Sequence, residues 1–340
     1  MTTPPDATRP RKVTLRDVAQ LAGVSLATAS KALNGRSQVH PETRRRVKEV
    51  ADRLAFTPNS LARAIVAGQT GTLGLLTSDL EGRFSLPILM GAEDATGAGQ
   101  MSVFLCDARG DAIRERYHLR ALLGRRVDGL IVVGSKTDPR PPLSEKVAVP
   151  VVYVYAPSAE PDDMSDVADN VRAGRLAVEH LLSTGRRRIA HVTGDPTYAA
   201  AHDRVRGADE ALAEAGLSLV GPPRFGAWTE AWGRTAATAV LEEHDDVDAI
   251  LVGSDQVARG VLDALHDRGV RVPQDVAVMG FDNWGPMVEG ARPSLTSVDM
   301  RFEEMGRRAV QRLLAALDGG AAPGVEAIEP RVVVRASTVG

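Results

Sequence analysis

The sequence predicts a small all-α head joined to a larger α/β body that is built from two lobes with parallel sheets. Residues 15–33 contain two short helix-periodic segments separated by a tight turn. From Thr72 onward, short apolar runs alternate with helix-like stretches, a pattern typical of parallel strands covered by helices on both faces. The 340 residues are 44% hydrophobic, which is enough for both parts to bury a core.

The head begins with a helix-turn-helix pattern. Apolar residues recur at helical spacing over Leu15–Ala22 and over Leu26–Leu33, and Gly23-Val24-Ser25 leaves room only for a turn. Thr14 and Ser25 are placed to cap the two helices with their side-chain oxygens. The competing interpretation is a simple helical hairpin with a solvated face.

The second helix of this pattern would present small, polar and cationic side chains outward. Such a face fits the major groove of DNA, where lysine donates to guanine acceptors and small apolar groups meet thymine methyls. A third helix is predicted from Pro41, with arginines and a lysine clustered on it. The outward set on the second helix is Leu26, Ala27, Thr28, Ser30, Lys31 and Asn34.

Charge is distributed unevenly along the chain, although the net charge is only −3. Residues 1–68 carry 12 Lys and Arg against 5 Asp and Glu, whereas the remaining residues carry 29 against 39. A basic head on an acidic body is typical of a DNA-binding module attached to a domain that stays off DNA. The alternative is a ribosome-binding or membrane-surface head, but the head lacks the stacking aromatics or the basic amphipathic helix that these would use.

Several patterns that would indicate other classes of protein are missing from the sequence. There is no apolar run of bilayer length and no charged-then-apolar leader, so we expect a cytoplasmic protein without a membrane partner. Cys106 is the single cysteine, which excludes an intrachain disulfide framework or a cysteine-based zinc site. A nucleophile elbow, a P-loop lysine and a dinucleotide fingerprint are also missing, so we expect no catalytic activity, cofactor or metal.

The head motifs resemble the lactose-repressor/galactose-repressor (LacI/GalR) family of bacterial transcription regulators. This resemblance implies a homodimeric regulator of a pseudo-palindromic DNA operator, expected to be a repressor that a small-molecule effector, a sugar, releases. A corepressor-dependent repressor or an activator of the same family, and a cytoplasmic sugar-binding protein that reads no operator, remain as alternatives. The matching motifs are VTLRDVAQLAGVS at 13–25, ALNG at 32–35, V-x-P-E-T-R-x-x-V at 39–47 and F-x-P-N at 56–59.

The resemblance also assigns roles to residues of the head. Leu26, Ala27 and Lys31 lie where the family reads bases, and the hydroxyl and amide side chains of Thr14, Ser25, Ser30, Asn34 and Thr43 lie where it holds phosphates.

A short alanine-rich segment, Asn59–Ala67, follows the head and is too small to be stable as an isolated helix. The resemblance implies that it pairs with its twin in the dimer and enters the minor groove, where Ile65 wedges between base pairs and Asn59 and Ala62 lie beside it. An ordinary linker helix is the alternative. The predicted divisions are an arm at 1–12, a helix-turn-helix domain at 13–58, a hinge helix and linker at 59–70, and a body at 71–340.

The alternating pattern of the body divides into two blocks, a layout that resembles periplasmic sugar-binding proteins, which close on a ligand by a hinge motion. We expect a first lobe at 71–160 with a return segment at 295–310, and a second lobe at 161–294 with 311–340. The last strand near Arg331 is not followed by a heptad pattern, so no tetramer built on a coiled coil is expected.

Ligands of such sheets bind beyond the carboxyl ends of the strands, and candidate contacts lie there. Arginine and carboxylates would grip hydroxyl groups while an aromatic ring covers the apolar face of a sugar. For Asp255 a role as helix cap is equally open, and Arg172 raises the alternative of an anionic or phosphorylated ligand. The predicted effector-binding residues, several of them placed by the resemblance, are Asp79, Phe84, Arg172, Arg204, Trp228, Ser254, Asp255 and Asp282.

Overall fold

A computed structural model describes residues 13–33, 38–56, 70–78, 80, 83–96 and 101–339. The chain forms two compact units, residues 1–70 and 71–340. The predicted arm and nearly all of the predicted hinge segment lie outside the described residues. The same holds for Asn34, Asn59, Ala62, Ile65 and Asp79.

The head contains three described helices, α1 (Leu15–Ala22), α2 (Leu26–Leu33) and α3 (Pro41–Arg53). The first two have the predicted bounds. A capping box closes the start of α1, because Thr14 accepts the backbone N–H of Asp17 while the Asp17 carboxylate accepts the N–H of Thr14. The core of the head is made of small residues: Val18, Ala19, Ala22, Ala29, Ala32, Val39, Val47, Val50 and Ala51.

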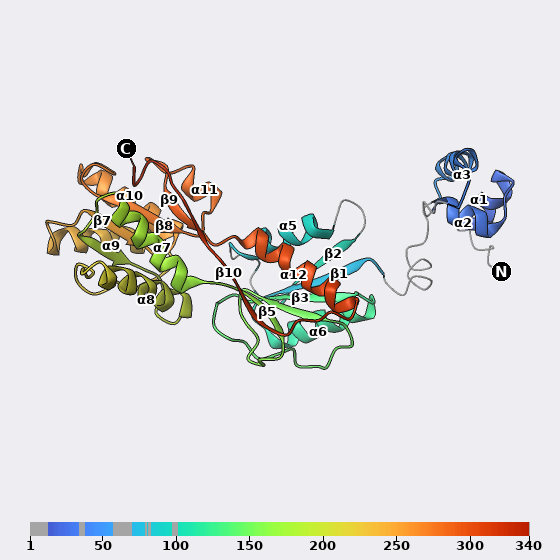
Figure 1. Ribbon diagram of the computed structural model, residues 1–340, viewed down its shortest axis with the longest axis horizontal. Helices are drawn as coiled ribbons and strands as arrows, with labels where there is room; N and C mark the ends of the chain where they lie inside the picture. Colours follow the sequence, from blue (N-terminus) through green and yellow to red (C-terminus); the bar gives the residue numbers. More distant parts are fainter. Residues whose placement is uncertain are drawn as a thin grey trace, which may run out of the picture. The chain divides into compact units, whose positions relative to one another are not determined.

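The first lobe of the body is a parallel sheet in the order β10-β5-β4-β3-β1-β2. Helices α5 and α12 cover one face of this sheet and α6 covers the other (Figure 1). The elements of this lobe are β1 (Thr72–Thr77), α5 (Ser85–Thr96), β2 (Ser102–Asp107), α6 (Ala112–Gly124), β3 (Gly129–Val133), β4 (Val151–Val154), β5 (Met164–Ala168), α12 (Phe302–Leu317) and β10 (Gly324–Ile328).

The second lobe has a sheet in the order β11-β9-β8-β7-β6, in which only the β11–β9 pair is antiparallel. Helices α7 and α8 pack on one face, and α9 and α10 on the other. Its elements are α7 (Asn170–Ser183), β6 (Ile189–Val192), α8 (Ala199–Glu214), α9 (Glu230–Glu243), β7 (Ala249–Val252), α10 (Asp255–Asp267), β8 (Ala277–Phe281), α11 (Gly285–Val288), β9 (Thr296–Asp299) and β11 (Arg331–Val333).

The predicted lobe boundaries are wrong at three places. β5 pairs with β4, so the first lobe continues to residue 168 rather than ending at 160. Residues 296–299 pair with β8 and belong to the second lobe, whereas α12 and β10 return to the first lobe as far as residue 328. In β5 and β9 buried polar residues interrupt the apolar pattern, and some of them have distant partners: Arg312 donates to the Asp166 carboxylate at 2.7 Å.

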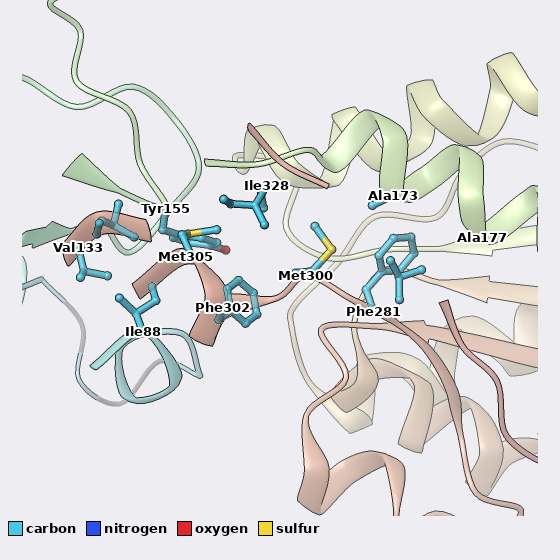
Figure 2. Close-up of a cluster of buried hydrophobic side chains, with 14 of the residues drawn as sticks. Ile88, Val133, Tyr155, Ala173, Ala177, Phe281, Met300, Phe302, Met305 and Ile328 are labelled. Atoms are coloured by element: carbon cyan, nitrogen blue, oxygen red, sulfur yellow. The ribbon is translucent and has the colours of Figure 1, made fainter. Parts of the chain in front are cut away.

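The chain therefore passes between the lobes after β5, after β9 and after β10. Met300 lies on the second of these crossings and is 1% exposed. Figure 2 shows Met300 and Ile328 between side chains of the first lobe, including Phe302, and side chains of the second lobe, including Phe281. One hydrophobic core thus continues from lobe to lobe through the crossing strands.

Reciprocal glycines bring pairs of helices into close contact. A Cβ on Gly91 of α5 would lie 1.8 Å from a backbone oxygen of α12, and one on Gly306 of α12 would lie 1.9 Å from a backbone oxygen of α5. Gly233 of α9 and Gly260 of α10 face each other's helices in the same way. Any larger residue at these positions would push the helices apart.

Candidate functional site

The outward face of α2 is the first candidate site. Leu26 is 50% exposed, and Ala27 and Lys31 are exposed as well. On the opposite side of the helix, Ala29 and Ala32 are fully buried against the other two helices of the head. The helix therefore presents small apolar groups and one cation, a surface that fits into a major groove.

Hydroxyl side chains lie at the helix starts of the head. The Ser25 hydroxyl accepts the backbone N–H of Thr28 at 3.1 Å, which confirms the predicted cap of α2. Ser30 and Thr28 are half-buried on α2, and Thr43 is half-buried in the first turn of α3. Hydroxyls and free N–H groups at such places hold phosphate groups without reading sequence.

Arg204 of α8 is the centre of the second candidate site, which lies in the body. Its side chain is 3% exposed, and its guanidinium lies 4.7 Å from the ring centroid of Phe281. Nε donates to the Asn170 side chain at 2.9 Å, Nη1 to the Gly253 carbonyl at 2.5 Å, and Nη2 to Asp282 Oδ1 at 3.3 Å. One side chain thus joins the starts of α7 and α10 to the end of β8.

Two glycines allow Arg204 to reach this position. A Cβ on Gly174 of α7 would lie 2.2 Å from the Arg204 carbonyl oxygen, and one on Gly207 of α8 would lie 1.9 Å from the Val171 carbonyl oxygen. The backbones of α7 and α8 therefore approach each other closely. This approach sets the short distance between Arg204 and Asn170.

Asp282 lies beside arginines of both lobes. It follows β8 with a φ of 95°, and its Oδ1 meets Arg204 of the same lobe. Its Oδ2 lies 3.3 Å from Nη1 of Arg83, which precedes α5 in the first lobe. The Arg83 guanidinium also lies 5.6 Å from the ring centroid of Phe84 and 5.7 Å from that of Trp284.

Ser254 and Asp255 have separate roles at the start of α10. The Ser254 hydroxyl accepts a backbone N–H one turn into the helix at 3.3 Å, so Ser254 is the cap and the alternative that Asp255 caps the helix is wrong. Asp255 is fully buried and accepts the Ser297 hydroxyl at 2.6 Å and the Trp284 backbone N–H at 2.7 Å. Burial and the nearby charge of Asp282 raise the pKa of Asp255 well above its usual value. Through its hydrogen bonds with Ser297 and Trp284, Asp255 supports the loop that carries Asp282.

An aromatic cluster forms the wall of the first lobe beside these charges. The rings of Phe84 and Tyr155 are stacked with centroids 4.4 Å apart, and Phe302 lies 4.9 Å from Phe84. Burial raises the pKa of Tyr155, on which Arg204 and Asp282 also act electrostatically. Tyr155 is therefore an uncharged hydroxyl close to both charged groups.

Trp228 belongs to a second aromatic group in the body. Its ring meets Tyr198 edge-on with centroids 5.7 Å apart, and the Lys136 ammonium lies 4.3 Å from the Tyr198 ring centroid. Lys136 follows β3 of the first lobe, whereas Tyr198 and Trp228 belong to the second lobe. Polar side chains of the two lobes thus approach each other here as well as at the Arg83–Asp282 pair.

Several buried polar atoms at the strand ends have no hydrogen-bond partner among the described residues. Such atoms are rare in folded proteins and commonly mark a place where water or a ligand binds. Both ring nitrogens of His191 are in this group, and burial together with Arg204 lowers the pKa of His191 to about 3. The others include Arg83 Nη1, Thr137 Oγ1, Thr193 Oγ1, Trp228 Nε1 and Asp282 Oδ2.

A cavity of about 410 Å³ lies beside the Arg83–Asp282 pair. Both residues line it, together with Trp284, Phe302 and the charged first turn of α12. Its volume is in the range of small-molecule sites.

Arg172 does not join the predicted effector-binding residues. Its guanidinium, 37% exposed, pairs with Glu179 at 3.1 Å along the surface of α7. The prediction that Arg172 faces the ligand is therefore not supported by this arrangement, because the helix periodicity directs its side chain along α7 toward Glu179.

Sequence reasoning did not list Arg83, Tyr155, Thr193 or Asn170 as site residues, although Asp169-Asn170 matches a motif of the family. Tyr155 and Thr193 directly follow a strand, Asn170 begins α7, and Arg83 lies two residues before α5, all at the carboxyl ends of the two sheets. Their position after strands β1, β4, β5 and β6 was a usable signal, but Arg83, Tyr155 and Thr193 belong to no motif.

Two negative findings concern the described residues only. No group of three or more His, Cys, Asp and Glu side chains in that part of the chain could hold a metal ion. None of the helices that the structure describes is both long and apolar enough to cross a membrane.

Comparisons with known proteins cover both units. The family model "Bacterial regulatory proteins, lacI family" matches residues 14–59, and the model "Periplasmic binding protein-like domain" matches residues 178–338. The chain is 34% identical to the HTH-type transcriptional regulator CelR of Thermobifida fusca over 97% of this chain and 99% of that protein.

Solved structures agree with these matches. The Lac repressor dimer bound to operator and the anti-inducer ONPF is similar with a TM-score of 0.77 and 27% identity, over 97% of this chain and 100% of that one. The complex of transcriptional regulator CelR with cellobiose is similar with a TM-score of 0.66 and 31% identity, over 96% and 99% of the two chains.

Proposed function

The chain belongs to the lacI family of bacterial regulatory proteins, and we propose that it is a transcriptional repressor that a sugar ligand releases from its operator. The observation that carries the ligand part is the cluster of buried, incompletely paired polar groups around Arg204 and Asp282. The observation that carries the DNA part is the exposed face of α2.

In the head, we propose that Leu26, Ala27 and Lys31 contact bases while the hydroxyls at the helix starts contact phosphates. The alanines on the inner face of α2 support this, because they let the helix lie close to the rest of the head with its other face exposed. Asn34, Asn59, Ala62 and Ile65 belong to the same proposal from sequence alone, Ile65 as a minor-groove wedge.

In the body, we propose that a polyhydroxylated ligand contacts Arg204, Asp282, Trp228 and Phe84. The similar CelR protein is known in a complex with cellobiose, and the similar Lac repressor binds operator as a dimer. Arginine and carboxylate groups beside aromatic rings are the side chains that bind sugars.

We propose that the protein acts as a homodimer on a pseudo-palindromic operator. A ligand that binds one arrangement of the lobes more tightly shifts the protein toward that arrangement, and this changes its affinity for DNA. We assign it no catalytic role, since the relatives are transcription regulators, and we place it in the bacterial cytoplasm with its chromosomal DNA.

A mobility-shift titration tests this proposal. The full chain is titrated at fixed salt onto DNA from upstream of its own gene and neighbouring genes, with and without cellobiose, ribose and other sugars. We expect a discrete complex that one sugar weakens, and we expect Lys31→Ala to weaken the specific complex about tenfold, or about 1.4 kcal/mol.

Each outcome of the titration bears on one part of the proposal. If every fragment binds no better than random-sequence DNA, the operator-reading role is wrong. If specific binding occurs but a sugar strengthens it, the protein is a corepressor-dependent regulator.

A further inference from the structure

The Arg83–Asp282 pair connects the two lobes but leaves its own polar atoms unsatisfied. Nη1 of Arg83 lies 3.3 Å from Oδ2 of Asp282, and the side chains are 14% and 2% exposed. Neither atom makes a hydrogen bond within the described part of the chain. A buried charged group without a hydrogen bond costs folding free energy, so this arrangement favours a third group that satisfies both atoms.

The neighbours of the pair hold it in place. Arg83 lies between the rings of Phe84 and Trp284, at 5.6 and 5.7 Å from their centroids. The other oxygen of Asp282 accepts from Arg204 Nη2, while Nε and Nη1 of Arg204 donate to Asn170 and to a backbone carbonyl. Oδ2 is therefore the carboxylate atom that has no hydrogen bond among the described residues, and it lies beside Arg83.

Only some chemical groups match this pair. A hydroxyl both donates and accepts, so it donates to Asp282 Oδ2 while it accepts from Arg83 Nη1. A carboxylate or phosphate only accepts, so it would satisfy Arg83 but place negative charge against Asp282. Both side chains line the adjacent cavity of about 410 Å³, but Nη1 and Oδ2 are enclosed, so a hydroxyl reaches both atoms only when the two side chains part.

We propose that one hydroxyl of the ligand bridges Arg83 and Asp282, so that the cleft selects a neutral sugar over the corresponding sugar acid or sugar phosphate. This inference rests on the proposed sugar control and names the chemical class of the ligand. Arg83 is then a specificity-determining residue, and its contact ties ligand binding to the approach of the two lobes. The anionic ligand suggested by Arg172 loses its support, because Arg172 pairs with Glu179.

Isothermal titration calorimetry on the full chain tests the proposal with matched sugar pairs. The probes are cellobiose and cellobionate, glucose and glucose 6-phosphate, and ribose and ribose 5-phosphate. We expect at least one neutral sugar to bind ten times more tightly than its charged partner. We expect Arg83→Met to weaken that binding at least tenfold, and Arg83→Lys to weaken it less, because the ammonium still donates.

Arg188→Met is the matched control. Arg188 is 50% exposed, pairs with Asp246 at 2.8 Å, and lies at the start of β6, away from the carboxyl ends of the strands. Its loss should leave sugar affinity unchanged. Unfolding midpoints of all variants are measured alongside, and if Arg83→Met does not fold, the comparison of Arg83→Lys with the unaltered chain carries the test.

The outcomes distinguish a failure of the hydroxyl bridge from a failure of the proposed sugar control. A sugar that binds Arg83→Met as tightly as the unaltered chain, or a charged partner that binds more tightly than its neutral parent, overturns the hydroxyl bridge alone. If none of the six probes binds, the proposed sugar control is wrong and the bridge fails with it.

Discussion

In the head, the candidate contact residues Leu26, Ala27 and Lys31 lie on an exposed helix face, whereas in the body the side chains of Arg204, Asp255 and Asp282 are buried. The head positions its surface with short-range devices, namely two capped helices and a core of alanines and valines. The body positions its buried groups with long-range interactions, namely close contacts at glycines between helices and ion pairs between segments that are distant in sequence. Function and stability should therefore be separable in the head and coupled in the body.

The largest effect should come from a buried ion pair of the body. Arg312 of α12 donates to the Asp166 carboxylate at 2.7 Å and to two backbone carbonyls near β10, at 2.6 and 3.0 Å. Arg312→Met leaves Asp166 unpaired, and we expect a loss of about 3–5 kcal/mol in the free energy of unfolding, measured by urea denaturation. The double variant Arg312→Met/Asp166→Leu should recover part of this loss. A single variant as stable as the unaltered chain would contradict the long-range account of the body.

The second-largest loss of stability should come from adding a single methyl group at Gly207. Gly207→Ala places a Cβ 1.9 Å from the Val171 carbonyl oxygen, so α7 and α8 must separate. We expect a loss of about 3 kcal/mol and weaker ligand binding, because Arg204 moves with α8. Gly124 at the end of α6 has no neighbouring atom within 4 Å of a built Cβ. Gly124→Ala is therefore the control, and equal unfolding midpoints for the two variants would show that the close contact is unimportant.

Acid should weaken the body through His191. Burial and Arg204 lower its pKa to about 3 in the folded state, below the usual histidine value of 6.5. Below pH 6.5 His191 binds a proton in the unfolded chain but stays neutral in the folded chain. The contribution of His191 to the free energy of unfolding is therefore fully present above pH 6.5 and is lost as the pH falls toward 3. At pH 5.5 the loss is about 1.4 kcal/mol.

His191→Leu isolates this contribution. The difference in unfolding free energy between the unaltered chain and His191→Leu is measured from pH 8 to pH 5. Because Asp255, with its raised pKa, titrates in both proteins, its opposite contribution cancels in the difference. If the difference does not change with pH, His191 does not contribute to the loss of stability in acid.

The smallest effect should be that of a cap in the head. Thr14→Ala removes the side-chain oxygen that accepts the Asp17 N–H, and we expect a loss of about 1 kcal/mol in local stability. Hydrogen exchange of α1 amides in the full chain measures this loss. Exchange in the body serves as the internal control and should not change, and a change there as large as in α1 would contradict the separation of the two units.

Local patterns in the sequence determined the head and part of the site. The bounds of α1 and α2 and the caps Thr14 and Ser25 follow from residues a few positions apart, because helix periodicity and capping act within one or two turns. The alternation of strands and helices likewise predicted the class of the body. Arg204 and Asp282 were found through their place in a motif.

Only the tertiary structure decided which distant groups meet. The partner of Asp282 in the first lobe is Arg83, about 200 residues earlier, and no local pattern indicates this pairing. Strands β5 and β9 were missed since polar residues such as Asp166 are stable in a buried strand only beside a remote partner, and β10 was missed since most of its residues are not buried. Arg172 was misplaced because its side chain had a nearer carboxylate, Glu179, on its own helix. Such contacts join segments that are far apart in the sequence. Which segments become neighbours is decided by the packing of helices and sheets in the tertiary structure.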